Sequence, residues 1–107
     1  MFSLFTLLIS SVSATFVSLG DWGSAAINSH YQNNVQRISS QLTKTIKEKN
    51  AEFVLNVGDN FYYCGIQNIN DPLINEDFRK PFKELENISW YNSLGNHDYG
   101  YNVSAQI

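Results

Sequence analysis

The stretch "FVLNVGDNFYYCG", from Phe53 to Gly65, joins an apolar run to a Gly-Asp-Asn turn and then to three aromatic residues in a row. The apolar run from Phe53 to Val57 predicts a strand that ends at Gly58. Two other stretches have the same build: "FVSLGDWG" from Phe16 to Gly23, and "WYNSLGNHDYG" from Trp90 to Gly100. In each, a glycine and a residue that can bind metal follow the apolar run. One shared site is therefore expected where the three strands end.

Two helical regions are expected between these strands. From Asn33 to Lys49, apolar residues recur at intervals of three and four, which predicts an amphipathic helix with Asn50 as its C-terminal cap. A second region begins with Asp71 as N-cap and Pro72 in the first turn, and Pro81 divides it in two. The apolar residues expected on the buried faces are Val35, Ile38, Leu42, Ile46, Phe78, Phe82 and Leu85.

The order strand, helix, strand, helix, strand predicts an α/β fold with a parallel sheet. The strands are expected at Thr15–Leu19, buried in the core, at Phe53–Val57 and at Trp90–Leu94. Right-handed crossovers make such strands parallel neighbours, so their carboxyl ends meet at one edge, where open α/β sheets bind ligands. Asp21, Asp59 and Asn96 are all expected at that edge.

The composition, the N-terminal stretch and a few short motifs limit the possible functions and locations. The 107 residues carry a formal net charge of −3 and no cluster of Lys and Arg, which argues against a nucleic-acid partner. The stretch "MFSLFTLLISSVSA" predicts a signal peptide over residues 1–14, too short to span a membrane, and a secreted or lysosomal/endomembrane location. Sequons at Asn87 and Asn102 are candidate glycosylation sites. Cys64 is the only cysteine, so it is free, paired with another chain or lacking its partner.

The residues at the strand ends form an oxygen-rich set of donors. Two carboxylates, an amide and a tyrosine suit hard cations such as ferric iron, manganese or magnesium, with zinc possible if histidines join. A carboxylate such as Asp59 can bridge two cations. The pattern therefore predicts a metal site, with Tyr62 or Tyr63 as the phenol.

The motifs "GDWG", "GDNFYYCG" and "GNHD", the last followed shortly by "NVSAQI", resemble those of the purple acid phosphatases, above all the tartrate-resistant type 5. These enzymes belong to the calcineurin-like metallophosphoesterase superfamily. The resemblance covers almost everything from Phe16 to Ile107. It implies that residues 15–107 are the N-terminal β-α-β-α-β half of the metallophosphoesterase αββα sandwich, with the C-terminal half absent.

The resemblance also implies the metal ligands. Asp21 would bind a ferric ion, Asp59 would bridge both metals, and Tyr62 would bind the ferric ion as phenolate. Asn96 would bind the second metal, Fe(II), Zn or Mn, through its amide oxygen. Gly23 stands where most of the superfamily has a histidine ligand, and Tyr62 would replace that ligand.

The residues that follow Asn96 carry the implied chemistry. His97 would orient the phosphate or protonate the leaving oxygen, and Asp98 would hold the ring of His97 in place. Trp22 and Phe61 are expected to pack around the site, as is Tyr63 if it is not a ligand, and His30 is expected in a loop.

The function implied is an acid phosphatase that hydrolyses phosphomonoesters, either small molecules or proteins, through a binuclear centre with a metal-activated hydroxide. The family uses three further ligands, all histidines, whereas this chain contains only His30 and His97. We therefore expect an incomplete and inactive fragment. The alternative is a secreted, non-catalytic module of the same fold that binds metal or a partner.

Overall fold

The computed structural model describes residues 13–23 and 29–107, with only the backbone for residues 29–32. The expected signal peptide lies outside the described residues except for Ser13 and Ala14, so it stays a prediction. In the part of the chain that the structure describes, no helix is long and apolar enough to span a bilayer.

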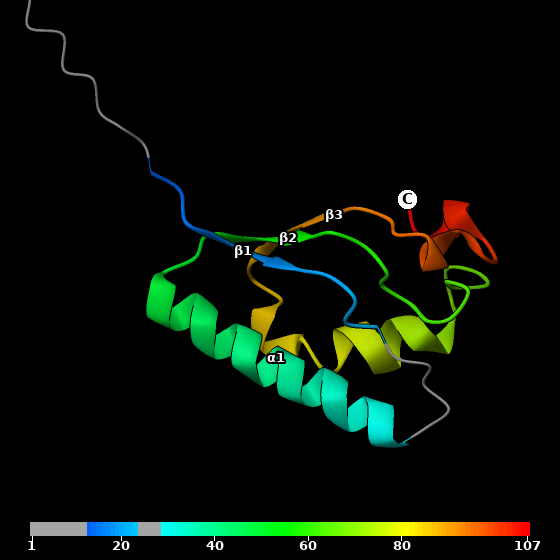
Figure 1. The fold of residues 1–107 in the computed structure, drawn as a ribbon, viewed down its shortest axis with the longest axis horizontal. Helices are drawn as coiled ribbons and strands as arrows, with labels where there is room; N and C mark the ends of the chain where they lie inside the picture. Colours follow the sequence, from blue (N-terminus) through cyan, green and yellow to red (C-terminus); the bar gives the residue numbers. More distant parts are fainter. Residues whose placement is uncertain (1–12, 24–28) are drawn as a thin grey trace, which may run out of the picture.

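Three parallel strands form one sheet in the order β1-β2-β3 (Figure 1). They are β1 at Phe16–Leu19, β2 at Phe53–Asn56 and β3 at Ser89–Asn92. Phe16 of β1 lies opposite Phe53 of β2, which in turn lies opposite Ser89 of β3. The predicted parallel α/β sheet is confirmed, and the strand bounds differ from the expected ones by one or two residues.

Helices cover one face of this sheet. The helix α1, Ser29–Lys49, connects β1 to β2, and two short helices connect β2 to β3 on the same side (Figure 1). These are the π-helix η1, Ile74–Arg79, and the 3-10 helix η2, Lys83–Leu85. The second region is therefore divided at Pro81 as predicted, because proline has no N–H to continue the helical ladder.

Two expectations about the helices need correction. The helix α1 begins at Ser29 rather than Asn33, so His30 belongs to the helix and not to a loop. The amide N–H of Leu73 donates to Asp71 Oδ1 (3.0 Å), which confirms the capping role of Asp71. The helix η1 itself has π geometry, which the apolar spacing did not indicate.

The hydrophobic core lies between the helices and the sheet. Trp22 is at its centre, with its ring against those of Phe61, Phe78 and Phe82 at centroid distances of 5.8, 5.6 and 5.3 Å. The predicted buried faces are confirmed, with Ile38 and Phe78 partly buried. The buried apolar residues are Trp22, Val35, Leu42, Ile46, Val54, Phe61, Ile66, Phe82 and Leu85.

The opposite face of the sheet carries aromatic side chains, and the described helices α1, η1 and η2 lie on the other side (Figure 1). Phe53 stacks on Phe16 (5.3 Å) and meets Tyr91 edge to face (5.4 Å). Phe16 and Tyr91 remain 50% and 59% exposed. The expectation that the first strand is buried was wrong: successive residues of a strand face opposite sides, and helices cover only one side.

Asn50 ends α1 in the left-handed backbone conformation, with φ at 51°. The N–H of the next residue, Ala51, donates to the carbonyl of Ile46 (3.0 Å), which is the Schellman arrangement. The predicted C-terminal cap is thus confirmed.

This cap gives a test of the local fold. Replacing Asn50 by alanine should lower the free energy of unfolding by about 1 kcal/mol, because a Cβ without a polar group disfavours the left-handed region. The matched variant Asn50→Gly should keep or slightly raise the stability, since glycine adopts this conformation freely. Urea unfolding followed by far-UV circular dichroism measures both, and equal losses would contradict the assignment.

Candidate metal centre

The two candidate aspartates occupy equivalent places on neighbouring strands. Asp21 follows β1 and Asp59 follows β2, and both have a positive φ of 53°. Aspartate and asparagine adopt this region more readily than other residues with a side chain. The N–H of Asp21 donates to the carbonyl of Gly58 (3.1 Å), which ties the two turns together. The expected meeting of the strand ends is therefore present.

The hydroxyl of Tyr62 joins the two carboxylates. It lies 2.6 Å from Asp21 Oδ1 and 3.3 Å from Asp59 Oδ2. The hydrogen bond to Asp21, burial and the charge of Asp59 raise the pKa of the Tyr62 phenol well above its usual value. Tyr63, the alternative ligand, is 63% exposed and its hydroxyl makes no hydrogen bond to a described residue. The geometry thus brings Tyr62, and not Tyr63, to the aspartates.

These oxygens fit a hard cation. Among the described residues, neither Asp21 nor Asp59 forms an ion pair with a Lys, Arg or His side chain. Two carboxylates without a cationic partner, together with a phenol, are donors that a highly charged metal ion prefers. Residues 13–23 and 29–107 contain no group of three or more His, Cys, Asp or Glu placed to hold a metal. The candidate set depends instead on two aspartates, a tyrosine and an asparagine.

The loop after β3 approaches Asp59 closely because two glycines meet there. A Cβ on Gly95 would lie 2.2 Å from Asp59 Oδ1, and a Cβ on Gly58 would lie 2.4 Å from the nitrogen of Gly95. The N–H of His97 donates to Asp59 Oδ1 (2.9 Å). Asn96 lies between these two contacts, which places it beside Asp59. Its side chain is exposed and makes no hydrogen bond to a described residue.

The ring of His97 lies against Tyr62, with 4.4 Å between the ring centroids. Its Nδ1 is 2.8 Å from the backbone carbonyl oxygen of Tyr63. A carbonyl oxygen only accepts, so Nδ1 carries the proton and Nε2 is the nitrogen that can exchange one. Tyr63 packs beside the site as expected, with its ring edge to face against Tyr62 (5.9 Å) and His97 (6.4 Å), although the ring is largely exposed.

Asp98 was expected to hold the ring of His97, and this expectation was wrong. The carboxylate is fully buried, and its hydrogen bonds within the described residues all come from backbone N–H groups. Its Oδ1 accepts from the backbone N–H groups of Asn60 (3.0 Å) and Phe61 (3.1 Å), and its Oδ2 from the backbone N–H of Gly95 (2.8 Å). The side chain faces the turns because three N–H donors converge there.

The matches to known proteins agree with this arrangement. The family model for calcineurin-like phosphoesterases matches residues 14–106. The chain belongs to the calcineurin-like phosphoesterase family. The resemblance drawn from "GDWG", "GDNFYYCG" and "GNHD" is thereby confirmed at the family level.

Several relatives in this phosphoesterase family are acid phosphatases. Tartrate-resistant acid phosphatase type 5 from Homo sapiens is 38% identical over 94 residues, which are 86% of this chain and 29% of the relative. The same enzyme from Oryctolagus cuniculus gives the same values. Purple acid phosphatase 7 from Arabidopsis thaliana is 34% identical over 96 residues, 89% of this chain and 28% of the relative. The chain thus spans less than a third of the length of these relatives.

A solved structure has the same fold. It is described as "GAP50 the anchor in the inner membrane complex of Plasmodium" and superposes with a TM-score of 0.71 at 26% sequence identity. The match covers 87% of this chain and 28% of that one. The three-stranded sheet with helices on one face is therefore an arrangement that this chain shares with that structure.

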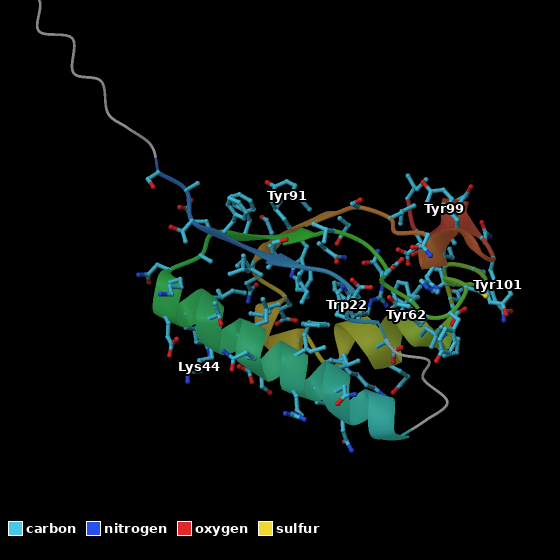
Figure 2. All side chains as sticks on the ribbon, in the orientation of Figure 1. Trp22, Lys44, Tyr62, Tyr91, Tyr99 and Tyr101 are labelled. Atoms are coloured by element: carbon cyan, nitrogen blue, oxygen red, sulfur yellow. The ribbon has the colours of Figure 1, made fainter. Side chains whose placement is uncertain are left out.

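A network of asparagines that the sequence did not predict lies beneath the turns, and its members Asn56 and Asn60 are buried. Trp22 Nε1 donates to Asn56 Oδ1 (2.9 Å), and Asn56 Nδ2 donates to Asn60 Oδ1 (2.6 Å) and Asn92 Oδ1 (3.0 Å). Figure 2 shows Trp22 and Tyr62 near each other at the carboxyl end of the sheet, with Tyr91 on the uncovered face. The signal in the sequence was a polar residue, Asn56, two positions after the buried Val54 on the same strand face.

Two further candidate residues lie at the surface. Asn87 and Asn102 are exposed, and their glycosylation stays a prediction. Cys64 is a free, exposed cysteine, and its contacts give it no role in the site.

The asparagine network predicts a measurable coupling. Asn56→Ala should lower the free energy of unfolding by about 1–3 kcal/mol, because the indole N–H of Trp22 would be buried without an acceptor. In the background Trp22→Phe, which lacks that donor, the same substitution should cost less. A double-mutant cycle by urea unfolding measures the coupling, and strictly additive losses would contradict it.

Proposed function

We propose that this chain supplies the first ligands of the binuclear metal centre of an acid phosphatase that hydrolyses phosphomonoesters. One observation carries the proposal: the Tyr62 hydroxyl lies between the carboxylates of Asp21 and Asp59 at the ends of neighbouring parallel strands. Open α/β sheets place their reactive groups at this edge. The acid phosphatase names of the relatives support the same reading.

Each ligand has a role in the proposal. Asp21 and Tyr62 would hold a ferric ion, because a phenol with a raised pKa gives up its proton only to a strong Lewis acid. One carboxylate oxygen of Asp59 faces Tyr62 and the other faces the loop after β3. Asp59 would therefore be shared between the ferric ion and a second ion, which is divalent: Fe(II), Zn or Mn. Asn96 beside Asp59 would bind that second ion.

When bound, the two ions would supply positive charge for the phosphate oxygens and activate water. His97 would orient the phosphate or give a proton to the leaving oxygen. The hydrogen bond from Nδ1 to the carbonyl of Tyr63 leaves Nε2 for that transfer. Asp98 is fully buried, so it would touch neither substrate nor metal.

The setting of the reaction follows from the same reading. Substrates would be phosphomonoesters of small molecules or proteins, with no nucleic-acid partner, in the lumen of the secretory pathway or outside the cell. Four ligands are few for two ions, and the relatives are more than three times longer than the matched part. We expect this chain by itself to bind metal weakly and to show no hydrolysis, with activity requiring further histidine ligands.

The ligand assignment can be tested by colour. Titration of the chain with Fe(III) at mildly acidic pH should produce a visible phenolate-to-iron absorption band. Tyr62→Phe should abolish the band, and Tyr63→Phe, the matched neighbour with an exposed ring, should keep it. A band that survives Tyr62→Phe and disappears in Tyr63→Phe would reverse the assignment.

A second candidate function is a non-catalytic module that binds a partner. The aromatic face formed by Phe16, Phe53 and Tyr91 is open in the described part of the chain, and the similar GAP50 structure is described as an anchor. A chromogenic phosphomonoester assay together with the iron titration separates the two functions. A folded chain that neither develops the iron band nor gains hydrolysis when the rest of a relative's domain is fused to it would favour the module.

A further inference from the structure

Two loops that carry candidate ligands exchange hydrogen bonds between their aspartates. Asp59, in the loop after β2, accepts the N–H of His97 from the loop after β3 (2.9 Å). In return Asp98, in the loop after β3, accepts the N–H groups of Asn60 and Phe61 from the loop after β2 (3.0 and 3.1 Å). Each loop thus supplies both a carboxylate and N–H donors to the other.

The carboxylate of Asp98 is fully buried and saturated with donors. Its second oxygen also accepts from Gly95 (2.8 Å) and, at 3.2 Å, from Asn60. A buried carboxylate without such donors would be strongly unfavourable, so the three N–H groups and the carboxylate keep one another in place. The glycines at 58 and 95 allow the backbones to come close enough for these bonds.

We propose that Asp98 is a positioning residue that fixes the loop of Asp59 against the loop of Asn96 before any metal binds. Asn60 and Phe61 follow Asp59 directly, and Gly95 immediately precedes Asn96. The carboxylate of Asp98 therefore binds the backbone next to each of the two candidate ligands. The inference rests on the proposed metal centre for its functional meaning. The clamp itself consists of contacts between protein atoms alone.

The variant Asp98→Asn tests the clamp, because it preserves the shape while replacing one acceptor oxygen by a donor that faces N–H groups. Amide hydrogen exchange by NMR on the metal-free chain should show loss of protection at Asn60, Phe61 and Gly95. The His97 amide, which Asp98 does not touch, should also exchange roughly tenfold faster or more, because its bond to Asp59 depends on the loops staying in register. An unchanged His97 amide would overturn the positioning role.

The matched control is Asp71→Asn. Asp71 also accepts two backbone N–H groups, from Gln67 (2.8 Å) and Leu73 (3.0 Å), but contacts none of the candidate ligands. Fe(III) titration should show an affinity about 10- to 100-fold lower for Asp98→Asn, as is typical when the groups that orient metal ligands are removed. Asp71→Asn should keep the wild-type affinity. Equal affinities for both variants would overturn the proposal.

Two outcomes separate this inference from the proposed function. If the wild-type chain binds no Fe(III), the metal centre fails, and the exchange data on the metal-free chain still decide the clamp. If Asp98→Asn does not fold, hydrogen exchange of the wild-type chain with and without iron tests the clamp instead. Protection of Asn60, Phe61 and Gly95 that is already complete without iron supports the clamp, and protection that develops only with iron overturns it.

Discussion

The close approach of the turns after β2 and β3 is the constraint on which the candidate site depends. Gly58 and Gly95 face each other at a distance that no Cβ would permit. The buried carboxylate of Asp98 lies between the same two loops and accepts hydrogen bonds from their backbone N–H groups. The proposed shared role of Asp59 and Asn96 therefore depends on this close approach of the two backbones.

The second support is polar and lies beneath the turns, where a small α/β domain would ordinarily be apolar. Asn56, on the inward face of the central strand, connects Trp22 from the turn after β1 with Asn92 of β3. Buried amides are costly unless their hydrogen bonds are satisfied, and here most of them are. The network therefore connects the carboxyl ends of the three neighbouring strands, while the aromatic rings around Trp22 form the apolar core.

The site is one-sided in this chain. Helices cover one face of the sheet, and the aromatic side chains of Phe16, Phe53 and Tyr91 occupy the other. Members of the calcineurin-like phosphoesterase family to which it is similar are more than three times as long as the matched part. The described residues thus bring the candidate ligands Asp21, Asp59 and Tyr62 together at one edge of the sheet.

The sequence by itself determined the parallel sheet, the amphipathic α1 and the family, because hydrophobic period and short motifs are local properties of the chain. It also identified Asp21, Asp59 and Asn96 as a group, since each follows a strand end, and the motif resemblance added Tyr62. Only the tertiary structure decided which face of the sheet is open, that the ring of His97 is held by the Tyr63 carbonyl, and that Asp98 binds backbone N–H groups instead. Those contacts join residues more than thirty positions apart, and no local pattern records which donor a side chain will meet.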